Sequence, residues 1–586
     1  MAGKRRVEVG RRRFIRVAGG TVAGAAVVGG GTFTALATGV LDSPSPQTLD
    51  GVPRSLVLSL PDTPQSVEPL PPMPDQLAEG VMSPPAPGTR IPFTGGTVDP
   101  QTVEDSIPTT LPFEFKTSGY RIDTELPEYM RPWRDRPTTW SNVTPNTENV
   151  YLDDEGVIQY RPDWNTPGYD QPVTQIQFAL GCITSYRVAT DPERKALFLK
   201  RAKAQAKRLI DKRVETRGAW YFPYPFDWYH PEHSGVSYKA PWYSGMAQGE
   251  AISLFIQLSQ LDGVTEEERT LYKAAADGAF SSLLRGDNAK PWVVNKDANG
   301  YFWIQEYPGA TPGTGDYTFN GMIFATFGLW DYYVATGNEL ALKLYDGAVT
   351  TMRDHFGRLR QAKWLSYYCH THRVPTKGYH QHHINLFRQL HWQTGSPVLA
   401  HQQDTLINDY PNALLLPKGS VAAFAAGTHT LYKLKTAGAP LYGWSPSMHD
   451  AQLATKKVTF TKATQAPVDI RRRIEGRGIY YRISAGAYAG YWVGEYYPKV
   501  FLRGVHLSTT YRPQRTATFP PDVSITCIKF GSDGQTGTTK TVRFAKSSKA
   551  PFDRRAIVNG RPMVHITAGG LTGYWAPAGP VLTDGH

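Results

Sequence analysis

The sequence predicts a multidomain α plus β protein, in which an (α/α) toroid-type helical domain precedes an all-β region with an internal duplication. Two observations support this prediction. From about residue 170 to 415, apolar residues recur at three- and four-residue spacing between recognisable helix caps. From residue 416 onward, β-branched and aromatic residues alternate with glycine turns, and one segment occurs twice.

The N-terminal residues 1–37 predict an export signal, which does not belong to the fold. Basic residues precede a run of small and apolar residues, and residues 11–16 (RRRFIR) fit the twin-arginine pattern. Residues 35–37 (ALA) offer a cleavage site, while the apolar run is also long enough to stay as a membrane anchor. We therefore expect export by the twin-arginine machinery to the cell envelope or the extracellular space.

The charge and the cysteines limit the classes of function. The net charge is +12, but residues 1–16 hold seven basic side chains against one acidic, which leaves about +6 on the mature chain. No dense lysine and arginine block remains, which argues against nucleic-acid binding and is compatible with an acidic polysaccharide. Three widely spaced cysteines exclude a disulfide scaffold or a CxxC metal knuckle.

Residues 38–112 contain sixteen prolines and no helical or strand periodicity, so we expect an extended linker. The helical domain is then expected over residues 113–415. Asp191 with Pro192 is typical of a helix start, and Thr265 with Glu268 forms a capping box. Such helices follow one another in pairs with short connections, which favours a toroid over a coiled coil.

One loop of the helical domain is unusually aromatic. Residues 220–243 contain ten aromatic side chains, of which we expect about half to be core, while loops of this kind also bind sugars by stacking.

The β-rich domain is expected over residues 416–586. Residues 458–493 and 542–576 repeat one pattern, with Gly-Tyr-Trp triplets at 490–492 and 573–575 in register. The tryptophans are best interpreted as core, and the repeat as a packing or binding module that could contact the cell wall.

Glu306 and Tyr307 are candidates for proton transfer. They lie on an aromatic, proline-bounded loop just before a helix that we expect to start near Asn320. Burial raises the pKa of a carboxyl group, and a nearby cation lowers the pKa of a phenol, so such a pair can exchange protons near neutral pH. Adjacent glutamate and tyrosine residues are also common on protein surfaces, so the pair alone is weak evidence.

Four short motifs, in order, resemble the C-terminal domain of the D-glucuronyl C5-epimerase family. They are WYSGMAQG at 242–249, EYP at 306–308, NG at 320–321 together with GLWD at 328–331, and YHQHHIN at 379–385. The resemblance covers roughly residues 150–410. It implies a helical toroid domain that converts D-glucuronate to L-iduronate within a polymer, with no metal and no other cofactor.

The resemblance also implies site residues. Glu306, Tyr307 and Tyr379 match the family's catalytic glutamate and two of its tyrosines. A third family tyrosine precedes an Asp-Leu-Arg-His run, for which Tyr367 is the best match and Tyr368 a competitor. The predicted substrate-binding residues are Trp242, Tyr243, Gln248, Asn320, His370, Arg373, His380, His383 and Asn385.

The sequence departs from the family at the expected arginine. His370 occupies its position, and Arg373 lies three residues later. How the substrate carboxylate is bound is therefore open at this stage. On a helix, His380 and His383 would share a face and could chelate a metal, but no third ligand with suitable spacing is evident.

Other functions remain open. A polysaccharide lyase begins with the same proton abstraction and then expels the O4 substituent, so the fold class does not separate the two. A glycoside hydrolase would need a second carboxylate, for which we find no partner to Glu306. A non-catalytic envelope protein that binds acidic polysaccharide is a third alternative. For the oligomeric state, we consider a homodimer.

Overall fold

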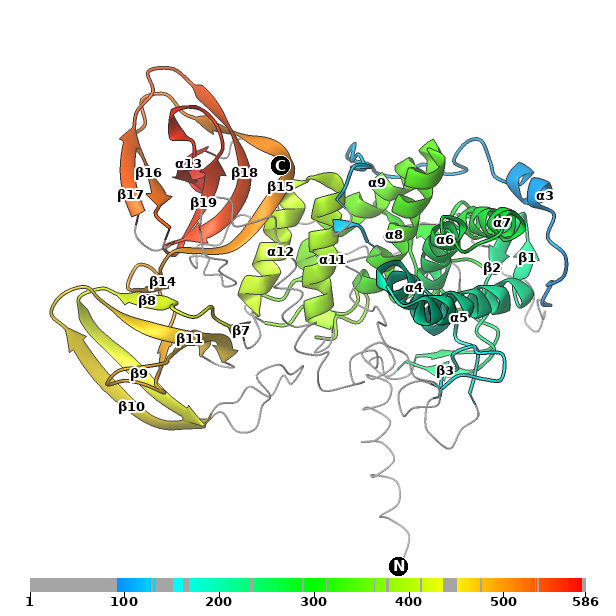
Figure 1. Ribbon diagram of the computed structural model, residues 1–586, viewed down its shortest axis with the longest axis horizontal. Coiled ribbons are helices and arrows are strands. Elements are labelled where there is room, and N and C mark those ends of the chain that lie inside the picture. The colour runs from blue at the N-terminus through cyan, green and yellow to red at the C-terminus, as the bar shows by residue number, and fades with distance from the viewer. Residues whose placement is uncertain are drawn as a thin grey trace, which may run out of the picture. The chain divides into compact units, whose positions relative to one another are not determined.

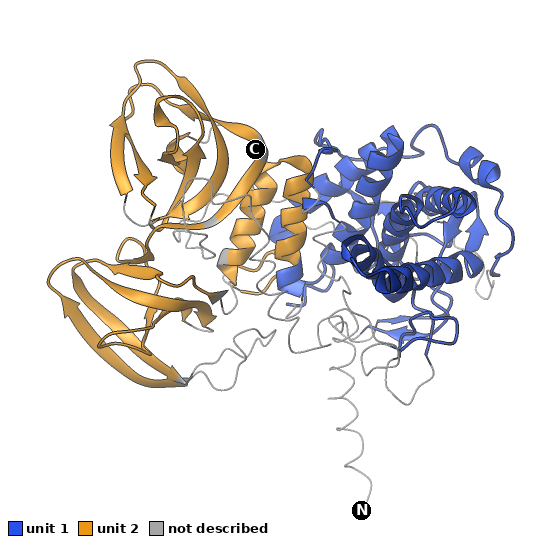
Figure 2. Ribbon diagram, in the orientation of Figure 1, with its two compact units in different colours: residues 1–32, 70–359, 367–382 blue, residues 33–69, 360–366, 383–586 orange. Residues whose placement is uncertain are grey.

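The computed structural model describes residues 92–127, 130–132, 151–161, 168–230, 236–286, 289–311, 314–362, 364–375, 379–410, 414–435, 451–474, 477–532, 534 and 537–581. Within this part, the chain divides into two compact units (Figure 2). Unit 1 comprises residues 92–359 and 367–382, and unit 2 comprises residues 360–366 and 383–581. The expected export signal and the linker up to residue 91 lie outside the described residues. Over the described ranges, no helix is long and apolar enough to cross a membrane.

Unit 1 is mainly helical (Figure 1). Its helices are α3 (Pro100–Asp105), α4 (Pro172–Val188), α5 (Pro192–Asp211), α6 (Gly245–Ser259), α7 (Glu266–Leu283), α8 (Phe319–Thr336), α9 (Glu339–Asp354), α10 (Phe356–Leu359) and the start of α11 (Tyr379–Thr394). Helices α4 and α5, α6 and α7, and α8 and α9 pack as consecutive pairs, and α6 also packs on α4 and α8. Every residue of α6 is buried, so this helix lies in the interior of the unit.

The helix ends follow the predicted capping chemistry. The Asp191 carboxylate accepts the backbone N–H groups of Glu193 and Arg194 at 3.3 and 3.4 Å. Thr265 and Glu268 form the capping box at the start of α7, with bonds of 3.2 and 3.0 Å. Each cap satisfies backbone donors that a helix leaves unpaired at its first turn.

Two glycines set the distance between α6 and α8. A Cβ on Gly249 would overlap the backbone of Ala325, and a Cβ on Gly328 would overlap the carbonyl of Gly249. The two helix backbones therefore touch, which side chains would prevent. At its start, α6 donates the N–H of Gly245 to the carbonyl oxygen of Gln305 at 2.7 Å, which holds the residue before Glu306.

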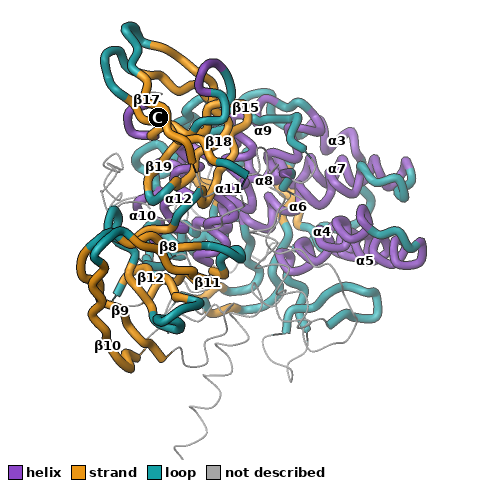
Figure 3. Tube along the Cα trace, turned by 60° about the vertical axis from the view of Figure 1, so that its left-hand side comes forward, coloured by secondary structure: helices purple, strands orange, loops and turns teal. Residues whose placement is uncertain are grey.

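Figure 3 shows the helices of unit 1 in purple. Three short antiparallel hairpins complete this unit. They pair β1 (Val214–Thr216) with β2 (Ala219–Tyr221), β3 (Trp228–Tyr229) with β4 (Ser237–Tyr238), and β5 (Val294–Lys296) with β6 (Phe302–Ile304). The second hairpin is built from the aromatic loop of the sequence, and the third leads directly into Glu306.

The expected linker ends earlier than residue 112. Residues 92–112 contain α3, and Val103 of this helix is 5% exposed. Thr94 donates its hydroxyl to the carbonyl of Arg213 at 3.1 Å, and Ser106 donates to the carbonyl of Gly218 at 2.9 Å. The prediction failed here because a helix of six residues gives little periodicity. In addition, Thr94 and Ser106 bond to residues more than a hundred positions away, which the local sequence does not reveal.

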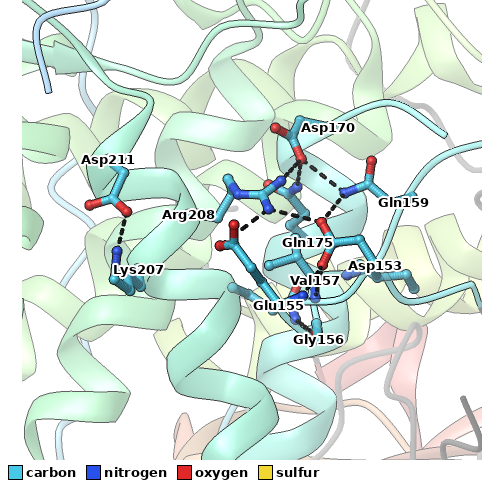
Figure 4. A network of polar contacts seen from close by, with 12 residues as sticks. Asp153, Glu155, Gly156, Val157, Gln159, Asp170, Gln175, Lys207, Arg208 and Asp211 are labelled. Atoms are coloured by element: carbon cyan, nitrogen blue, oxygen red, sulfur yellow. Dashed lines mark hydrogen bonds and ion pairs between the residues drawn. The ribbon is translucent and has the colours of Figure 1, made fainter.

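One arginine holds the segment before α4 against α5 (Figure 4). The Arg208 guanidinium contacts carboxylate oxygens of Asp170 at 2.6 Å and Asp153 at 2.8 Å, and Glu155 lies 3.4 Å away. The Gln159 amide donates to both Asp153 and Asp170. Burial lowers the pKa of Arg208, but the charges of Asp170 and Asp153 outweigh burial, so its pKa is raised and the guanidinium stays charged.

Unit 2 contains the rest of α11, helix α12 (Pro397–Asp409) and two larger antiparallel sheets. The strands of the first sheet are β7 (Leu414–Leu415), β8 (Val421–Phe424), β9 (Gly427–Lys435), β10 (Ala451–Phe460), β11 (Thr464–Ile474), β12 (Gly478–Ile483), β13 (Trp492–Gly494) and β14 (Val500–Leu502). Those of the second sheet are β15 (Val505–Phe519), β16 (Ile525–Phe530), β17 (Gly537–Val542), β18 (Ser548–Val558), β19 (Arg561–Ile566) and β20 (Trp575–Pro577). A short helix, α13 (Ala578–Val581), follows β20.

The two repeated segments have the same strand order. In the first sheet the order is β11-β12-β13-β9-β10, and in the second it is β18-β19-β20-β16-β17. Both copies turn before their tyrosine on glycines with positive φ, at Gly490 (81°) and Gly573 (79°). The tryptophans that follow, Trp492 and Trp575, are buried in the cores of the two sheets.

The predicted helical domain, residues 113–415, is divided between the two units. Residues 383–410, which form most of α11 and all of α12, belong with the β strands in unit 2. The imidazole of His391 lies within hydrogen-bonding distance of the Thr510 carbonyl, and Asp404 accepts the Thr509 hydroxyl at 3.0 Å. The mixture of helices with a C-terminal β region is as predicted, whereas the predicted boundary at 415 is not where the units divide.

Candidate active site

Glu306 is a buried carboxylate held at the start of a helix. It follows β6, is 4% exposed, and accepts the hydroxyl of Thr318 at 2.8 Å. Thr318 is the N-cap of α8, and a Cβ on Gly321 in the first turn would overlap the Glu306 carboxylate. A residue with a side chain at position 321 would therefore displace the carboxylate.

Burial shifts the pKa of Glu306 to a value suited to proton transfer. Loss of solvent raises this pKa to about 7, and the charges of Asp316 and Glu250 act in the same direction. Hydrogen bonds from Thr318 and Tyr307 oppose the shift without cancelling it. A carboxyl group with this pKa can both accept and donate a proton near neutral pH.

Three tyrosines lie together beside Glu306. The hydroxyls of Tyr307 and Tyr368 hydrogen bond, and the rings of Tyr368 and Tyr379 lie 4.8 Å apart. We call Glu306, Tyr307, Tyr368 and Tyr379 the Glu306 cluster. Burial, followed by the charge of Glu306, raises the pKa of both Tyr307 and Tyr368 well above 10. These two phenols are therefore neutral hydrogen-bond donors at neutral pH, rather than phenolate bases.

Aromatic side chains surround the ring of Tyr307. It stacks on Trp228 at 5.0 Å and lies 5.7 Å from Tyr238 and 6.2 Å from Trp242. All three come from the aromatic loop, and Trp228 is partly exposed. Tyr379 is partly exposed as well, so solvent reaches the cluster at these rings. Partly exposed aromatic side chains of this kind can contact sugars.

A histidine and an aspartate that sequence reasoning missed adjoin the cluster. His230 is 5% exposed, and its ring meets Tyr307 edge-on at 4.9 Å and Tyr368 at 5.7 Å. Its Nε2 lies 3.5 Å from Oδ2 of Asp316, whose other oxygen lies 3.5 Å from Nδ1 of His372. The one available signal was the position of His230 within the aromatic loop.

Tyr367, the preferred sequence match for the third tyrosine, lies outside the cluster. The Arg373 guanidinium covers its ring at 4.6 Å, and its backbone pairs with that of Pro375. Neighbouring residues of an extended segment point to opposite sides, so Tyr368 faces the cluster when Tyr367 does not. The alternative match, Tyr368, is thus the one that the structure brings to Glu306.

The change from Tyr367 to Tyr368 also changes the comparison with the Asp-Leu-Arg-His run. With Tyr368 as the tyrosine, Thr371 occupies the position of the arginine and His372 that of the histidine. His370 packs instead against Trp303 at 5.7 Å and His355 at 5.3 Å. Burial lowers the pKa of His370 to about 3, so its imidazole is neutral and does not provide the expected cation.

Of the two other residues predicted to bind substrate near Trp242, Gln248 has a structural role. Gln248 is fully buried, accepts the N–H of Phe222 at 3.0 Å and donates to the Trp220 carbonyl at 2.6 Å. These bonds fix the aromatic loop on α6, so the predicted substrate contact of Gln248 is replaced by a contact within the protein. Tyr243 packs edge-on against Tyr221 at 5.8 Å.

The remaining predicted residues are buried on α8 and α11. The side-chain amide of Asn320 is fully buried and has no hydrogen-bond partner in the described part of the chain. His380 is buried in unit 1, and His383 and Asn385 are buried in unit 2. His383 contacts the Ser366 hydroxyl through Nδ1 at 2.7 Å. The substrate-binding roles of these four residues stay predictions.

Metal binding was the other interpretation of the histidines on α11. Over the part of the chain that the structure describes, no group of three or more His, Cys, Asp or Glu side chains is arranged to hold a metal ion.

A comparison with known families gives a match over a range that includes this site. The family model described as D-glucuronyl C5-epimerase C-terminus matches residues 215–406. The matched range contains β2 to β6, all of the Glu306 cluster, and α11. Over residues 215–406, this chain is therefore similar to the D-glucuronyl C5-epimerase family.

Proposed function

We propose that this protein is a polysaccharide uronate C5-epimerase that converts D-glucuronate to L-iduronate residues. The observation that carries the proposal is the buried Glu306 carboxyl with a pKa of about 7, hydrogen-bonded to a neutral phenol and adjoined by two more tyrosines. The match of residues 215–406 to the family model supports the same chemistry.

The reaction breaks the C5–H bond next to a carboxylate. Ionised Glu306 accepts the proton, and the electron pair of the broken bond moves into the carboxylate, which then carries a second negative charge. Tyr307 and Tyr368, as neutral donors, stabilise that charge by hydrogen bonds, which are strong when made to an anion at a site with little water. Tyr379 then donates a proton to C5 from the opposite face, and the configuration is inverted.

The setting of this activity is also a proposal. We propose that the chain acts on an acidic polysaccharide after export to the cell envelope or beyond it, and that the β repeats contact the wall. The helix pairs of unit 1 are proposed to form part of an (α/α) toroid.

Incubation of the purified protein with several uronic-acid polymers in deuterated water tests the proposal. NMR should show deuterium entering C5 without chain cleavage. An unsaturated product that absorbs in the near ultraviolet would instead identify a lyase, and binding without either product would identify a non-catalytic protein.

The two neighbouring tyrosines give a matched test of the site. Tyr368→Phe removes a hydroxyl from the cluster and should slow deuterium uptake by about 100-fold, within the usual range for a proton-transfer group. Tyr367→Phe removes a hydroxyl one residue away and should leave the rate within about threefold. Equal effects of the two variants would refute the assignment of Tyr368.

A further inference from the structure

A C5-epimerase must neutralise the carboxylate of its substrate, and the expected arginine is absent. As C5 loses its proton, charge accumulates on a group that is already anionic, so the site needs a positive charge close to it. Neutral His370 occupies the position at which sequence reasoning placed that charge. With Tyr368 as the matching tyrosine, Thr371 occupies that position and is uncharged. Arg373 covers Tyr367, outside the Glu306 cluster.

His230 is placed where such a cation would act. Its ring lies 4.9 Å from the ring of Tyr307 and 5.7 Å from that of Tyr368, the two neutral phenols beside Glu306. A substrate carboxylate that accepts hydrogen bonds from these two phenols would therefore lie close to the imidazole of His230. The loop that carries His230 also carries Trp228, which stacks on Tyr307 at 5.0 Å.

The carboxylate of Asp316 favours the protonated, positively charged form of His230. Its carboxylate is 3% exposed and lies 3.5 Å from His230 Nε2. A carboxylate at this distance stabilises the protonated imidazole and fixes the orientation of the ring. Asp316 also hydrogen bonds to the Tyr238 hydroxyl and lies 3.5 Å from His372, so it is held from three directions.

We propose that His230, oriented by Asp316, provides the positive charge that recognises the uronate carboxylate, in place of the arginine that this chain lacks. The inference rests on the proposed function for its substrate class. It assigns the specificity of the site for a carboxylate-bearing sugar to the aromatic loop, rather than to the segment around residue 370. His230 is a positioning residue that acts through Tyr307 and Tyr368.

Binding measurements test this assignment apart from turnover. The full chain carrying Tyr379→Phe is titrated with a glucuronate-containing oligosaccharide and with its carboxyl-reduced counterpart. We expect the carboxylate form to bind at least tenfold more tightly. Adding His230→Gln should remove this preference, whereas adding His370→Gln should preserve it. His370 is the matched control because both histidines are 5% exposed.

A preference that survives His230→Gln, or that disappears with His370→Gln, overturns the proposal. Should His230→Gln fail to fold, Asp316→Asn leaves the imidazole in place and is expected to weaken the same preference by about threefold or more. A preference unchanged in a folded Asp316→Asn variant also overturns it.

Turnover then separates the two proposals. In a protein that retains Tyr379, His230→Gln should lower kcat/KM on the polymer by 10- to 100-fold. His230→Arg, which restores a positive charge, should recover part of this loss. If the preference for the carboxylate form depends on His230 but wild-type protein shows no exchange at C5, the epimerase proposal is refuted and the carboxylate site is retained. If exchange at C5 occurs but the preference does not depend on His230, the carboxylate site is refuted and the epimerase proposal is retained.

Discussion

Two carboxylates of unit 2 have fixed cationic partners, which Glu306 of unit 1 lacks among the described residues. In unit 2, Glu495 pairs with the Arg471 guanidinium at 3.0 and 3.1 Å. Burial raises the pKa of Asp553 in the same unit, but the hydrogen bond from His565 and the charge of Arg554 outweigh burial and lower it. In unit 1, Glu306 is buried among phenols and near other carboxylates, and its pKa rises to about 7.

The difference separates ion-paired carboxylates from one that can exchange protons near neutral pH. A fixed cation keeps a buried acid ionised at every physiological pH, so the pair holds strands together but moves no protons. A buried acid stabilised only by neutral donors is poised between its two states. Glutamate thus serves the fold at position 495, and we propose that it serves the chemistry at position 306.

The largest effect is expected from Glu306→Gln. Because the amide cannot accept the C5 proton, deuterium uptake should fall by about a thousandfold, within the range for loss of a general base. Glu495→Gln is the matched control and should change the rate by less than about twofold when assayed below its melting temperature. Retention of more than a tenth of the activity by Glu306→Gln would remove Glu306 from the mechanism.

Glu495→Gln should instead destabilise unit 2. The Arg471 side chain is fully buried, and removal of its partner leaves an unpaired charge, which costs about 3–5 kcal/mol. Urea unfolding of the full chain, followed by a probe in unit 2, measures the loss. The double variant Arg471→Met and Glu495→Gln should recover at least half of the stability. A single variant as stable as wild type would show that the pair contributes nothing.

The pKa of Glu306 links stability to pH with a definite sign. Its folded-state pKa of about 7 exceeds the ordinary unfolded value, so the folded state binds more protons between the two. Stability should therefore fall by about 3 kcal/mol as pH rises from 5 to 8. Activity that depends on ionised Glu306 should rise over the same interval.

The control for this pH effect is Glu306→Gln, in which the contribution of this group to the pH dependence disappears. Unfolding measured at pH 5 and pH 8 in both proteins gives the difference directly. Identical pH slopes in the two proteins would mean that the carboxyl group is not shifted.

The smallest effect is expected from Gly321→Ala. Its methyl group would lie 2.6 Å from the Glu306 Cβ, so the carboxylate must move, at a cost of about 1–3 kcal/mol. Deuterium uptake should fall by about tenfold because the base is displaced. Gly579→Ala, where no atom lies within 4 Å of the added carbon, should leave stability and activity unchanged. Equal behaviour of the two variants would contradict the placement of Glu306 over α8.

Part of the site could be predicted from the sequence. Glu306, Tyr307 and Tyr379 lie in short motifs whose order is typical of the family, and the structure brings all three together. Gln248 lies in such a motif too, yet its amide is used within the protein. A motif shows that a residue matters but does not distinguish a substrate contact from a buried support.

Sequence by itself determined the local features: the capped helices, the glycine turns of the repeat, and the adjacent glutamate and tyrosine. These depend on residues a few positions apart, for which spacing fixes geometry. Only the tertiary structure chose Tyr368 over Tyr367, because that choice depends on which side of an extended segment faces the cluster. It also brought His230 to Asp316, since packing alone joins side chains so far apart in the chain.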